Sequence, residues 1–187
     1  MPDVKRLLDA VAAAFLLVVL GPLFAVVALL IRVSSPGPVL FRQTRIGLEG
    51  RPFSILKFRS MVVNASALGS WSTRRNDPRI TSFGRLLRRT SLDELPQLLN
   101  VLRGDMSLVG PRPDVPEQKS LYTEEEWRTR HGVRPGITGW AQVSFRHEGT
   151  PERRKAYDLD YVRNRNLVFD VRILLLTVRH ILSKKSY

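Results

Sequence analysis

The sequence predicts an α+β fold that is mostly helical, and three observations lead to this prediction. A long apolar segment, 10–31, lies near the start of the chain and has a proline at its centre. Two short segments, 39–46 and 53–61, alternate weakly around turn residues, as the strands of a β-hairpin do. Most of the remaining chain shows helical patterns separated by loops rich in proline and glycine. A length of 187 residues favours one such unit.

The apolar segment from Ala10 to Ile31 carries no charge. At about 1.5 Å per residue it is long enough to cross a hydrocarbon core roughly 30 Å thick. Pro22, which follows Gly21, removes a helical hydrogen-bond donor, so a kink is expected there. Basic residues lie on both sides of the segment (Lys5 and Arg6 before it; Arg32, Arg42 and Arg45 after it), which favours placing both ends in the cytoplasm. We therefore expect residues 1–33 to form a re-entrant helix-break-helix membrane anchor, with a single-pass helix as the alternative.

Residues 34–187 are expected to form a cytoplasmic, membrane-associated unit. In the hairpin, the two-residue period of a strand puts Lys57 and Arg59 on one face. Segment 64–78 reads as a loop whose Trp71 either touches the membrane interface or packs inside. Helices are predicted over 80–89 and 95–102, the second ending near Gly104.

The C-terminal half is expected to continue with an ordered loop, further helices and one short strand. The prediction, in order, is a loop over 105–118, an exposed charged helix over 122–131, a rigid turn over 134–140, a strand over 141–145 and a polar helix over 151–164. Segment 167–182 is apolar nearly all round but is interrupted by Asp170, Arg172, Arg179 and His180. It suits either an amphipathic helix in the membrane interface or a buried core helix.

Composition narrows the possible chemistry. The formal net charge of +13 favours polyanionic partners such as nucleic acid, anionic lipid or phosphorylated substrates. The chain has no cysteine, which excludes disulfides, thiol nucleophiles and thiolate metal sites. Its three histidines, His131, His147 and His180, have no zinc-like spacing. Neither a P-loop nor a dinucleotide-binding glycine motif is present.

Two adjacent carboxylates, Asp93 and Glu94, lie in a segment dense with arginine. One interpretation is structural: Ser91 and Glu94 match a capping box, or Asp93 itself caps a helix that has Pro96 in its first turn. The other is chemical, because a carboxylate near a helix start can attack phosphorus while its neighbour holds Mg²⁺.

Several cations and one aromatic turn surround this pair in the sequence. Arg88 precedes it, and the sequence Pro111-Arg112-Pro113 holds an arginine between two rigid residues, which suits binding of a phosphate. Lys57 and Arg59 could neutralise a diphosphate or be exposed strand charges. Segment 134–140 combines a cation, glycines that let a ligand approach the backbone closely, and an aromatic ring, which suits a nucleotide site. The candidate residues are Arg134, Gly136, Thr138 and Trp140, although the tryptophan could equally belong to the core.

Five segments together resemble the bacterial sugar transferases, the small monotopic polyprenyl-phosphate phosphoglycosyl transferases. They are KFRSM (57–61), TSLDELPQLLN (90–100), RGDMSLVGPRP (103–113), RPGITGW (134–140) and YDLDYV (157–162), and they cover nearly the whole chain in order. The family's re-entrant helix usually breaks at a Ser-Pro pair, and here Gly21-Pro22 stands in that place.

The resemblance implies an Mg²⁺-dependent transfer of a phosphosugar from a UDP-sugar to polyprenyl (undecaprenyl) phosphate, with UMP as the other product. It implies Asp93 as the nucleophile and Glu94 as the Mg²⁺ ligand. Arg112 would contact phosphate, and segment 134–140 would help to seat the nucleotide. The expected location is the cytoplasmic face of a bacterial inner membrane, in contact with lipid, at the first membrane step of a surface glycan or glycoconjugate pathway. A homodimer is a further possibility.

Two other classes of protein compete with this interpretation. A membrane-tethered nucleic-acid-binding protein would show steeply salt-dependent binding, but no nucleic-acid-binding motif is present, so no nucleic-acid partner is expected. A membrane scaffold with a degenerate site is disfavoured by the intact Asp93–Glu94 pair.

Overall fold

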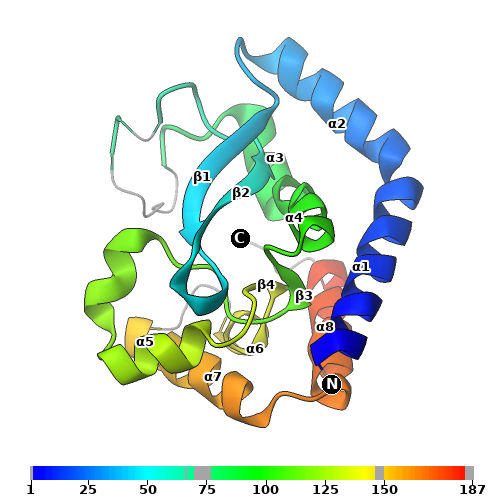
Figure 1. Ribbon diagram of the computed structural model, residues 1–187. Helices are drawn as coiled ribbons and strands as arrows, with labels where there is room; N and C mark the ends of the chain where they lie inside the picture. Colours follow the sequence, from blue (N-terminus) through cyan, green and yellow to red (C-terminus); the bar gives the residue numbers. More distant parts are fainter. Residues whose placement is uncertain (1, 66, 70–76, 146–149, 184–187) are drawn as a thin grey trace.

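The computed structural model describes residues 2–65, 67–69, 77–145 and 150–183, so Trp71 and His147 lie outside the described residues. Within this part of the chain, eight α-helices surround two small two-stranded sheets (Figure 1). The α+β, mostly helical fold class expected from the sequence is therefore confirmed.

Two helices, α1 (Pro2–Val19) and α2 (Gly21–Ser34), form the N-terminal segment and meet at an angle of 63°. Leu20 occupies the break, and Pro22 lies in the first turn of α2, where its missing N–H leaves no hydrogen bond unmade. The predicted kink is confirmed. In the described part of the chain no single helix is long and apolar enough to cross a membrane, whereas this bent pair meets the requirement on length and composition alone.

One face of the helix pair belongs to the protein core. Ala13 of α1 packs with Val101 and Met106, and Val27 and Ile31 of α2 pack in a second buried cluster, which includes Phe58 and Leu87. The pair runs along one side of the molecule in Figure 1. Its other face is apolar and exposed, as at Leu7, Val11, Phe15, Val18, Val26 and Leu29.

Polar contacts tie both ends of the helix pair to later parts of the chain. Near the start of α1, Lys5 pairs with Asp170 at 2.6 Å, and Arg6 donates to the main-chain carbonyls of Val101 and Leu102. After α2, the main-chain carbonyls of Ser35 and Pro36 accept hydrogen bonds from Arg59. The beginning and the end of the pair therefore face the same folded unit.

The predicted hairpin is present as β1 (Leu40–Ile46) and β2 (Pro52–Phe58), paired antiparallel with Phe41 opposite Lys57 and Arg45 opposite Phe53. Because β2 ends at Phe58, Arg59 lies beyond the strand that was expected to continue to Met61. A second sheet was not predicted. In it, β3 (Ser107–Val109) and β4 (Gly136–Thr138) pair in parallel, inside segments expected to be a loop and a turn.

The middle of the chain folds into α3 (Ser82–Arg89), a short 3-10 helix (Leu92–Glu94) and α4 (Gln97–Arg103). Thr81 caps α3 by accepting from the backbone N–H of Gly84. Gly104 ends α4 at φ 92, a left-handed conformation that glycine adopts without steric cost, as the sequence predicted.

The C-terminal part contains a short 3-10 helix (Pro116–Leu121) and the helices α5 (Glu124–His131), α6 (Trp140–Phe145), α7 (Pro151–Asn164) and α8 (Leu167–Leu182). The helices predicted over 151–164 and 167–182 are present as α7 and α8. The strand expected over 141–145 is wrong, because these residues continue as helix α6 after the turn at Gly139. The helix at 124–131 is not fully exposed either, because Arg130 and His131 are buried.

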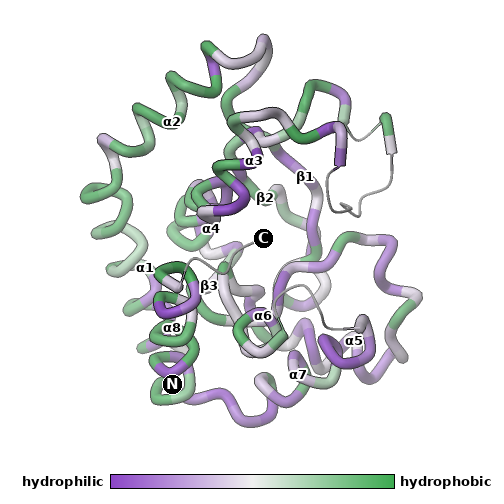
Figure 2. The backbone as a smooth tube through the Cα atoms, turned by 180° about the vertical axis from the view of Figure 1, so that it is seen from behind, coloured by the Kyte–Doolittle hydropathy of each residue, from purple (hydrophilic) through white to green (hydrophobic). Residues whose placement is uncertain are grey.

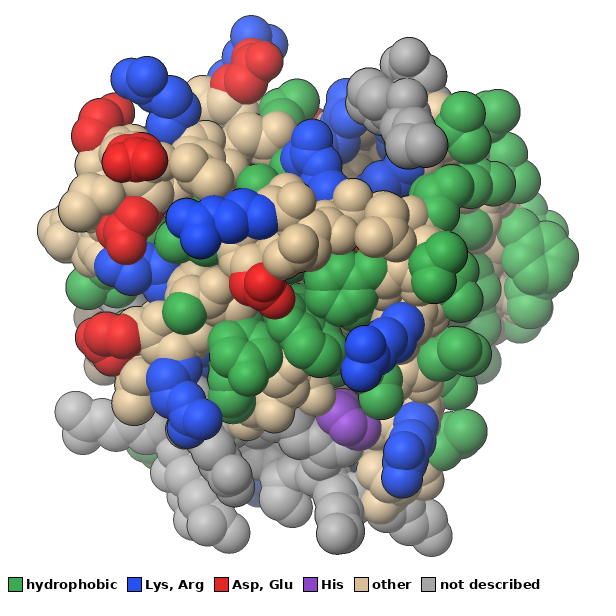
Figure 3. Space-filling view, turned by 90° about the horizontal axis from the view of Figure 1, so that it is seen from below, with side chains coloured by type: hydrophobic (Ala, Val, Ile, Leu, Met, Phe, Trp, Pro, Cys, Tyr) green, Lys and Arg blue, Asp and Glu red, His purple; other side chains and the backbone are tan. Residues whose placement is uncertain are grey.

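Apolar residues gather in α1, α2 and α8, whereas α5 and α7 are mainly polar (Figure 2). Helix α8 buries Ile173 against Val109, Val143 and Tyr161, but it also exposes an apolar row that includes Val168, Val171, Leu175, Val178 and Leu182. Figure 3 shows exposed apolar side chains crowded along the side of the molecule where α1 lies, with acidic groups mainly on the opposite side. Helix α8 thus combines a core contact with an exposed apolar face.

Candidate active site

A sharp change of backbone direction sets the position of Asp93 and Glu94. Helix α3 ends at Arg89, and Ser91 adopts a left-handed conformation at φ 56, which is uncommon for a residue with a side chain. The chain then makes the 3-10 helix Leu92–Glu94 and enters α4. Both capping predictions are wrong: Ser91 makes no side-chain cap, and Pro96 rather than Asp93 occupies the N-cap of α4. The two acids are therefore not used as helix caps.

Glu94 is held by two cations from different parts of the chain. Its Oε1 accepts from Nζ of Lys57 at 2.8 Å and from Nη2 of Arg112 at 2.8 Å. Burial raises the pKa of this carboxyl, but the charges and hydrogen bonds of Arg112 and Lys57 outweigh burial, so the pKa lies well below its usual range. Glu94 is consequently ionised at neutral pH, and its side chain is held between Lys57 of β2 and Arg112 of the following loop.

Asp93 has the opposite environment. Its side chain is buried, and within the described residues it makes no hydrogen bond or ion pair. Burial, and then the charge of Glu94, raise its pKa against the opposing effect of Lys57, Arg88 and Arg112. An unpaired, poorly solvated carboxylate next to several cations is suited to nucleophilic attack on a phosphorus atom.

Arg88 approaches the pair from α3. Its Nε donates to the hydroxyl of Ser60 at 2.8 Å, which fixes the guanidinium near Asp93. The structure therefore brings together Asp93, Glu94, Lys57, Arg88 and Arg112, five of the residues that the sequence singled out.

A buried polar cluster fixes the backbone of the loop that carries Arg112. Arg130 donates to the main-chain carbonyl of Arg112 at 2.7 Å and pairs with the carboxylates of Asp114 and Asp158. Burial would lower the pKa of Arg130, but Asp158 and Asp114 raise it, so the charge is retained. The sequence analysis missed this cluster, because its residues lie far apart in the chain.

Two polar residues close to the acids also escaped the sequence analysis. Arg45 of β1 lies beside the Arg112 loop, where Nη1 donates to the carbonyl of Pro113 at 3.0 Å. Gln97 lies about one helical turn after Asp93, and its buried Nε2 has no hydrogen-bond partner within the described residues. The strand period could have pointed to Arg45, since it places residues 41, 43 and 45 on one face.

Arg59 is placed away from this cluster. Its guanidinium is bonded to Ser35 and Pro36 and fixes the exit of α2, so the expected common face with Lys57 is not formed.

The residues of segment 134–140 contact other parts of the protein. Nε of Arg134 donates to the carbonyl of Gly104, and the hydroxyls of Thr138 and Thr177 are 2.7 Å apart. Gly136 is needed for packing, because a Cβ there would collide with the backbone of Gly110. Trp140 stacks on Tyr157 with 5.7 Å between ring centroids. Nucleotide binding by these four residues stays a prediction.

The donor groups suit a magnesium ion shared with substrate rather than a preformed metal cage. Within the described residues no group of three or more His, Cys, Asp or Glu side chains could hold a metal. Mg²⁺ commonly uses one or two carboxylates and completes its shell with substrate phosphates and water. Glu94 could supply such an oxygen, because its Oε1 binds Lys57 and Arg112 while its Oε2 makes no hydrogen bond within the described residues, so this residue fits the ion.

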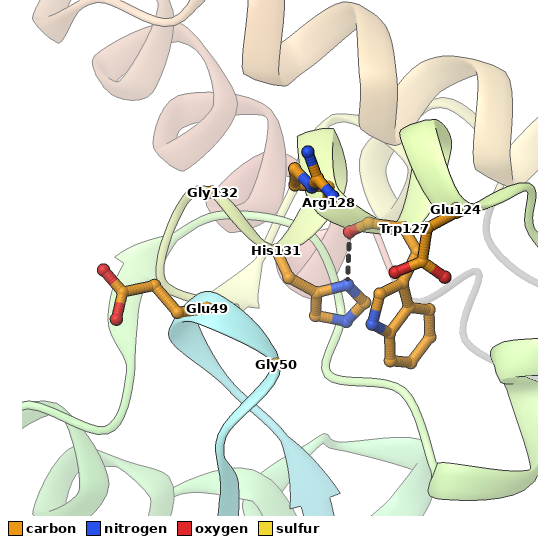
Figure 4. Close-up of a pocket in the computed structure, with 7 residues that line it drawn as sticks. All are labelled: Glu49, Gly50, Glu124, Trp127, Arg128, His131 and Gly132. Carbon is orange, nitrogen blue, oxygen red and sulfur yellow. Dashed lines mark hydrogen bonds between the residues drawn. The ribbon is translucent and has the colours of Figure 1, made fainter.

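A pocket of about 300 Å³ lies elsewhere, between the β1–β2 turn and α5. Figure 4 shows the turn at Glu49 and Gly50 beside the rings of His131 and Trp127, with the Glu49 carboxylate directed away from both; Nδ1 of His131 is bonded to the carbonyl of Trp127 at 2.8 Å. Burial lowers the pKa of His131 to about 4, so the ring is neutral near pH 7. This pocket contains neither Asp93 nor Glu94, and the polar cluster at those acids is the better candidate for chemistry.

The family model for bacterial sugar transferases matches residues 2–184. The chain belongs to the bacterial sugar transferase family. The match includes the helix pair as well as the Asp93–Glu94 cluster, so the whole described fold belongs to this family.

Relatives in this family carry names that specify different sugars. An Escherichia coli (strain K12) protein named UDP-glucose:undecaprenyl-phosphate glucose-1-phosphate transferase is 45% identical over 98% of this chain and 41% of its own length. An Aeromonas hydrophila UDP-N-acetylgalactosamine-undecaprenyl-phosphate N-acetylgalactosaminephosphotransferase is 42% identical over 96% of this chain and 44% of its own length. The Rhizobium leguminosarum bv. phaseoli exopolysaccharide production protein PSS is 46% identical over 93% of this chain and 92% of its length. This chain thus spans less than half of the first two relatives.

Proposed function

We propose that this chain transfers a phosphosugar from a UDP-sugar to polyprenyl phosphate, giving a polyprenyl-diphosphate sugar and UMP. The observation that carries the proposal is the contrast within one acidic pair: Glu94 is neutralised by two cations, whereas Asp93 is buried without a partner among the described residues. The names of the relatives support the same substrate classes.

In the first displacement, a carboxylate oxygen of Asp93 attacks the β-phosphorus of the UDP-sugar. The bond from that phosphorus to the bridging oxygen breaks, and UMP leaves with the bridging oxygen and its electron pair. The sugar phosphate remains on Asp93 as an acyl phosphate. Lys57, Arg88 and Arg112 neutralise the phosphate charge that increases during this step.

In the second displacement, a phosphate oxygen of polyprenyl phosphate attacks the same phosphorus. The bond between that phosphorus and Asp93 breaks, which regenerates the carboxylate and yields the polyprenyl-diphosphate sugar. Glu94, together with the donor phosphates, would hold Mg²⁺, which would supply further charge neutralisation at the diphosphate.

The acceptor is largely hydrocarbon, so the reaction requires the site to lie at a bilayer surface. We propose that α1 and α2 form a re-entrant anchor and that α8 lies in the interface on the cytoplasmic face of a bacterial inner membrane. The contacts of Lys5 and Arg6 at one end, and of Arg59 at the other, support this arrangement. Contact of both ends of the helix pair with one folded unit favours a re-entrant anchor over a single-pass helix. The predicted homodimer stays a prediction.

The test is UMP release from a panel of UDP-sugars, with Mg²⁺ and undecaprenyl phosphate, using the full chain in nanodiscs. We expect multiple-turnover release with at least one donor, dependent on the lipid phosphate and on Asp93. Without the lipid phosphate, release should stop at no more than one UMP per protein, because Asp93 stays occupied. The matched control is Glu125→Gln, an exposed acid of α5 outside the cluster, which should keep wild-type activity. If undecaprenyl phosphate gains no sugar phosphate with any donor, the proposal is wrong.

A further inference from the structure

Arg45 is a cation that the protein orients without neutralising it. Its Nε and Nη2 donate to Oε1 of Gln43, at 3.1 and 2.7 Å, and Nη1 donates to the main-chain carbonyl of Pro113 at 3.0 Å. All these acceptors are uncharged. Within the described residues, no carboxylate lies within ion-pair distance of its guanidinium.

The strand that carries Arg45 is joined to the loop that carries Arg112. The backbone N–H of Ile46 donates to the carbonyl of Asp114 at 2.9 Å, and Arg45 itself binds the residue that follows Arg112. Burial, and next the charge of Arg112, lower the pKa of Arg45 to about 10. Two arginines without a shared carboxylate therefore lie close together, an arrangement that an anion would stabilise.

Arg112 connects Arg45 to the acidic pair. Its Nη2 donates to Glu94 at 2.8 Å, and the carbonyl of the next residue, Pro113, accepts from Arg45 at 3.0 Å. The charge of Arg112 acts on both Asp93 and Arg45. Arg45 therefore adjoins Arg112, the cation that binds the neighbour of Asp93.

We propose that Arg45 binds the phosphate of the nucleoside monophosphate half of the donor, the group that leaves as UMP. This inference rests on the proposed function, because it needs the phosphorus next to Asp93 to be the one that carries the sugar. The neighbouring phosphate of the same diphosphate then lies next to it, within reach of Arg112 and Arg45.

The donor geometry of Arg45 suits this role. A guanidinium has five N–H donors. Three are used by Gln43 and Pro113, so two remain for phosphate oxygens. Gln43 and the Pro113 carbonyl hold the planar fork in place, which lowers the entropy lost when phosphate binds. When the bridging bond breaks, negative charge grows on the leaving phosphate, and Arg45 is placed to stabilise it.

The decisive experiment measures binding of UMP to the full chain in nanodiscs by calorimetry, with wild type, Arg45→Gln and Arg45→Lys. Arg42→Gln is the matched control. It removes an exposed arginine of the same strand that lies opposite Leu56, on the other face of the hairpin. Thermal melting of each variant reports whether the fold is retained.

We expect Arg45→Gln to weaken UMP binding about 10-fold or more, Arg45→Lys to restore part of it, and Arg42→Gln to bind as wild type. Exchange of labelled UMP into the UDP-sugar should slow in parallel, while KM for undecaprenyl phosphate changes less than about 2-fold. This split separates a contact with the leaving group from general damage to the site.

Two results would overturn the assignment. One is a folded Arg45→Gln protein that binds UMP as tightly as wild type. The other is an equal loss for UMP and for undecaprenyl phosphate, which would indicate a structural role. If wild type turns over normally in either case, the proposed function stands and only Arg45 is misassigned. Absence of both UMP binding and turnover in wild type would refute both proposals.

Discussion

Arg130 donates a 2.7 Å hydrogen bond to the main-chain carbonyl of Arg112, so a buried arginine fixes the backbone of the arginine that contacts Glu94. Arg112 is itself nearly half exposed, with 46% of its side chain accessible. Its position depends on the Arg130 cluster below and on Pro111 and Pro113 beside it. The backbone of the loop is thus fixed, whereas the side chain of Arg112 is accessible to solvent, where a substrate phosphate would bind.

Asp93→Asn is expected to abolish UMP release and covalent capture of the sugar phosphate, because an amide is not a nucleophile for phosphorus. The raised pKa means that ionised Asp93 destabilises the folded state at neutral pH. The asparagine variant should therefore melt no lower than wild type. Mass spectrometry of the intact protein after incubation with UDP-sugar measures capture. A retained adduct would move the nucleophile to another residue.

Glu94→Gln is expected to weaken Mg²⁺ binding, so the half-saturating Mg²⁺ concentration should change. Activity should fall by about 10-fold or more, since one hydrogen-bonded charge is lost from the site. The substitution also leaves Lys57 without the carboxylate that binds it at 2.8 Å. A metal titration of UMP release measures the effect. An unchanged half-saturating Mg²⁺ concentration would assign Glu94 to orienting Lys57 and Arg112 rather than to the metal.

The acid limb of the pH–rate profile is expected above the ordinary aspartate pKa of about 3.9. Burial and the charge of Glu94 raise the pKa of Asp93, so the reactive carboxylate forms only at higher pH, and the rate rises as the proton leaves. In Glu94→Gln that repulsion is absent, so the limb should move to lower pH. Single-turnover capture as a function of pH measures both. A limb that does not respond to this substitution would belong to another group.

Arg130→Met should destabilise the fold by about 3–5 kcal/mol, because it leaves the carboxylates of Asp114 and Asp158 buried without their cation. Denaturant unfolding in detergent measures this loss. Arg130→Lys keeps the charge but loses the two-point contact, so we expect intermediate stability and a raised KM for the UDP-sugar. Wild-type kinetics in the lysine variant would show that the Arg112 loop does not need the hydrogen bond to its carbonyl.

Cysteine labelling should find both ends of the helix pair on one side of the membrane. The chain has no cysteine of its own, so Val4→Cys and Pro38→Cys each give a single exposed label site. Both should react only when reagent reaches the cytoplasmic face. Reaction of the two sites from opposite sides would establish a spanning helix and refute the re-entrant anchor.

Local patterns were sufficient wherever one side chain or one period decides the conformation. Pro22 predicted the break between α1 and α2, and Gly104 predicted the end of α4. The extents of α7 and α8 also followed from the sequence. In each case the cause lies within a few residues, in a missing donor, a left-handed φ or a helical period.

The errors occur where distant segments compete with local preference. Residues 107–109 and 136–138 form strands because each segment hydrogen-bonds to the other. The local sequence of either segment does not indicate which segment will pair with it. Segment 141–145 alternates like a strand but is helical, with Ala141 and Val143 buried. Ser91 and Glu94 match a capping box in sequence, but they do not form one. Ser91 adopts a left-handed backbone conformation, and the carboxylate of Glu94 binds Lys57 and Arg112 instead.

The sequence by itself determined the apolar N-terminal segment, the break at Pro22, the acidic pair and the cations that suit phosphate, because these depend on residue type and short-range spacing. Only the tertiary structure decided that Lys57 and Arg112 meet on Glu94, that Asp93 has no partner within the described part of the chain and that Arg59 binds the exit of α2. It also buried Arg130 beneath the Arg112 loop and placed Arg45 beside it. These contacts join residues far apart in the chain, and strand register and helix packing bring them within bonding distance.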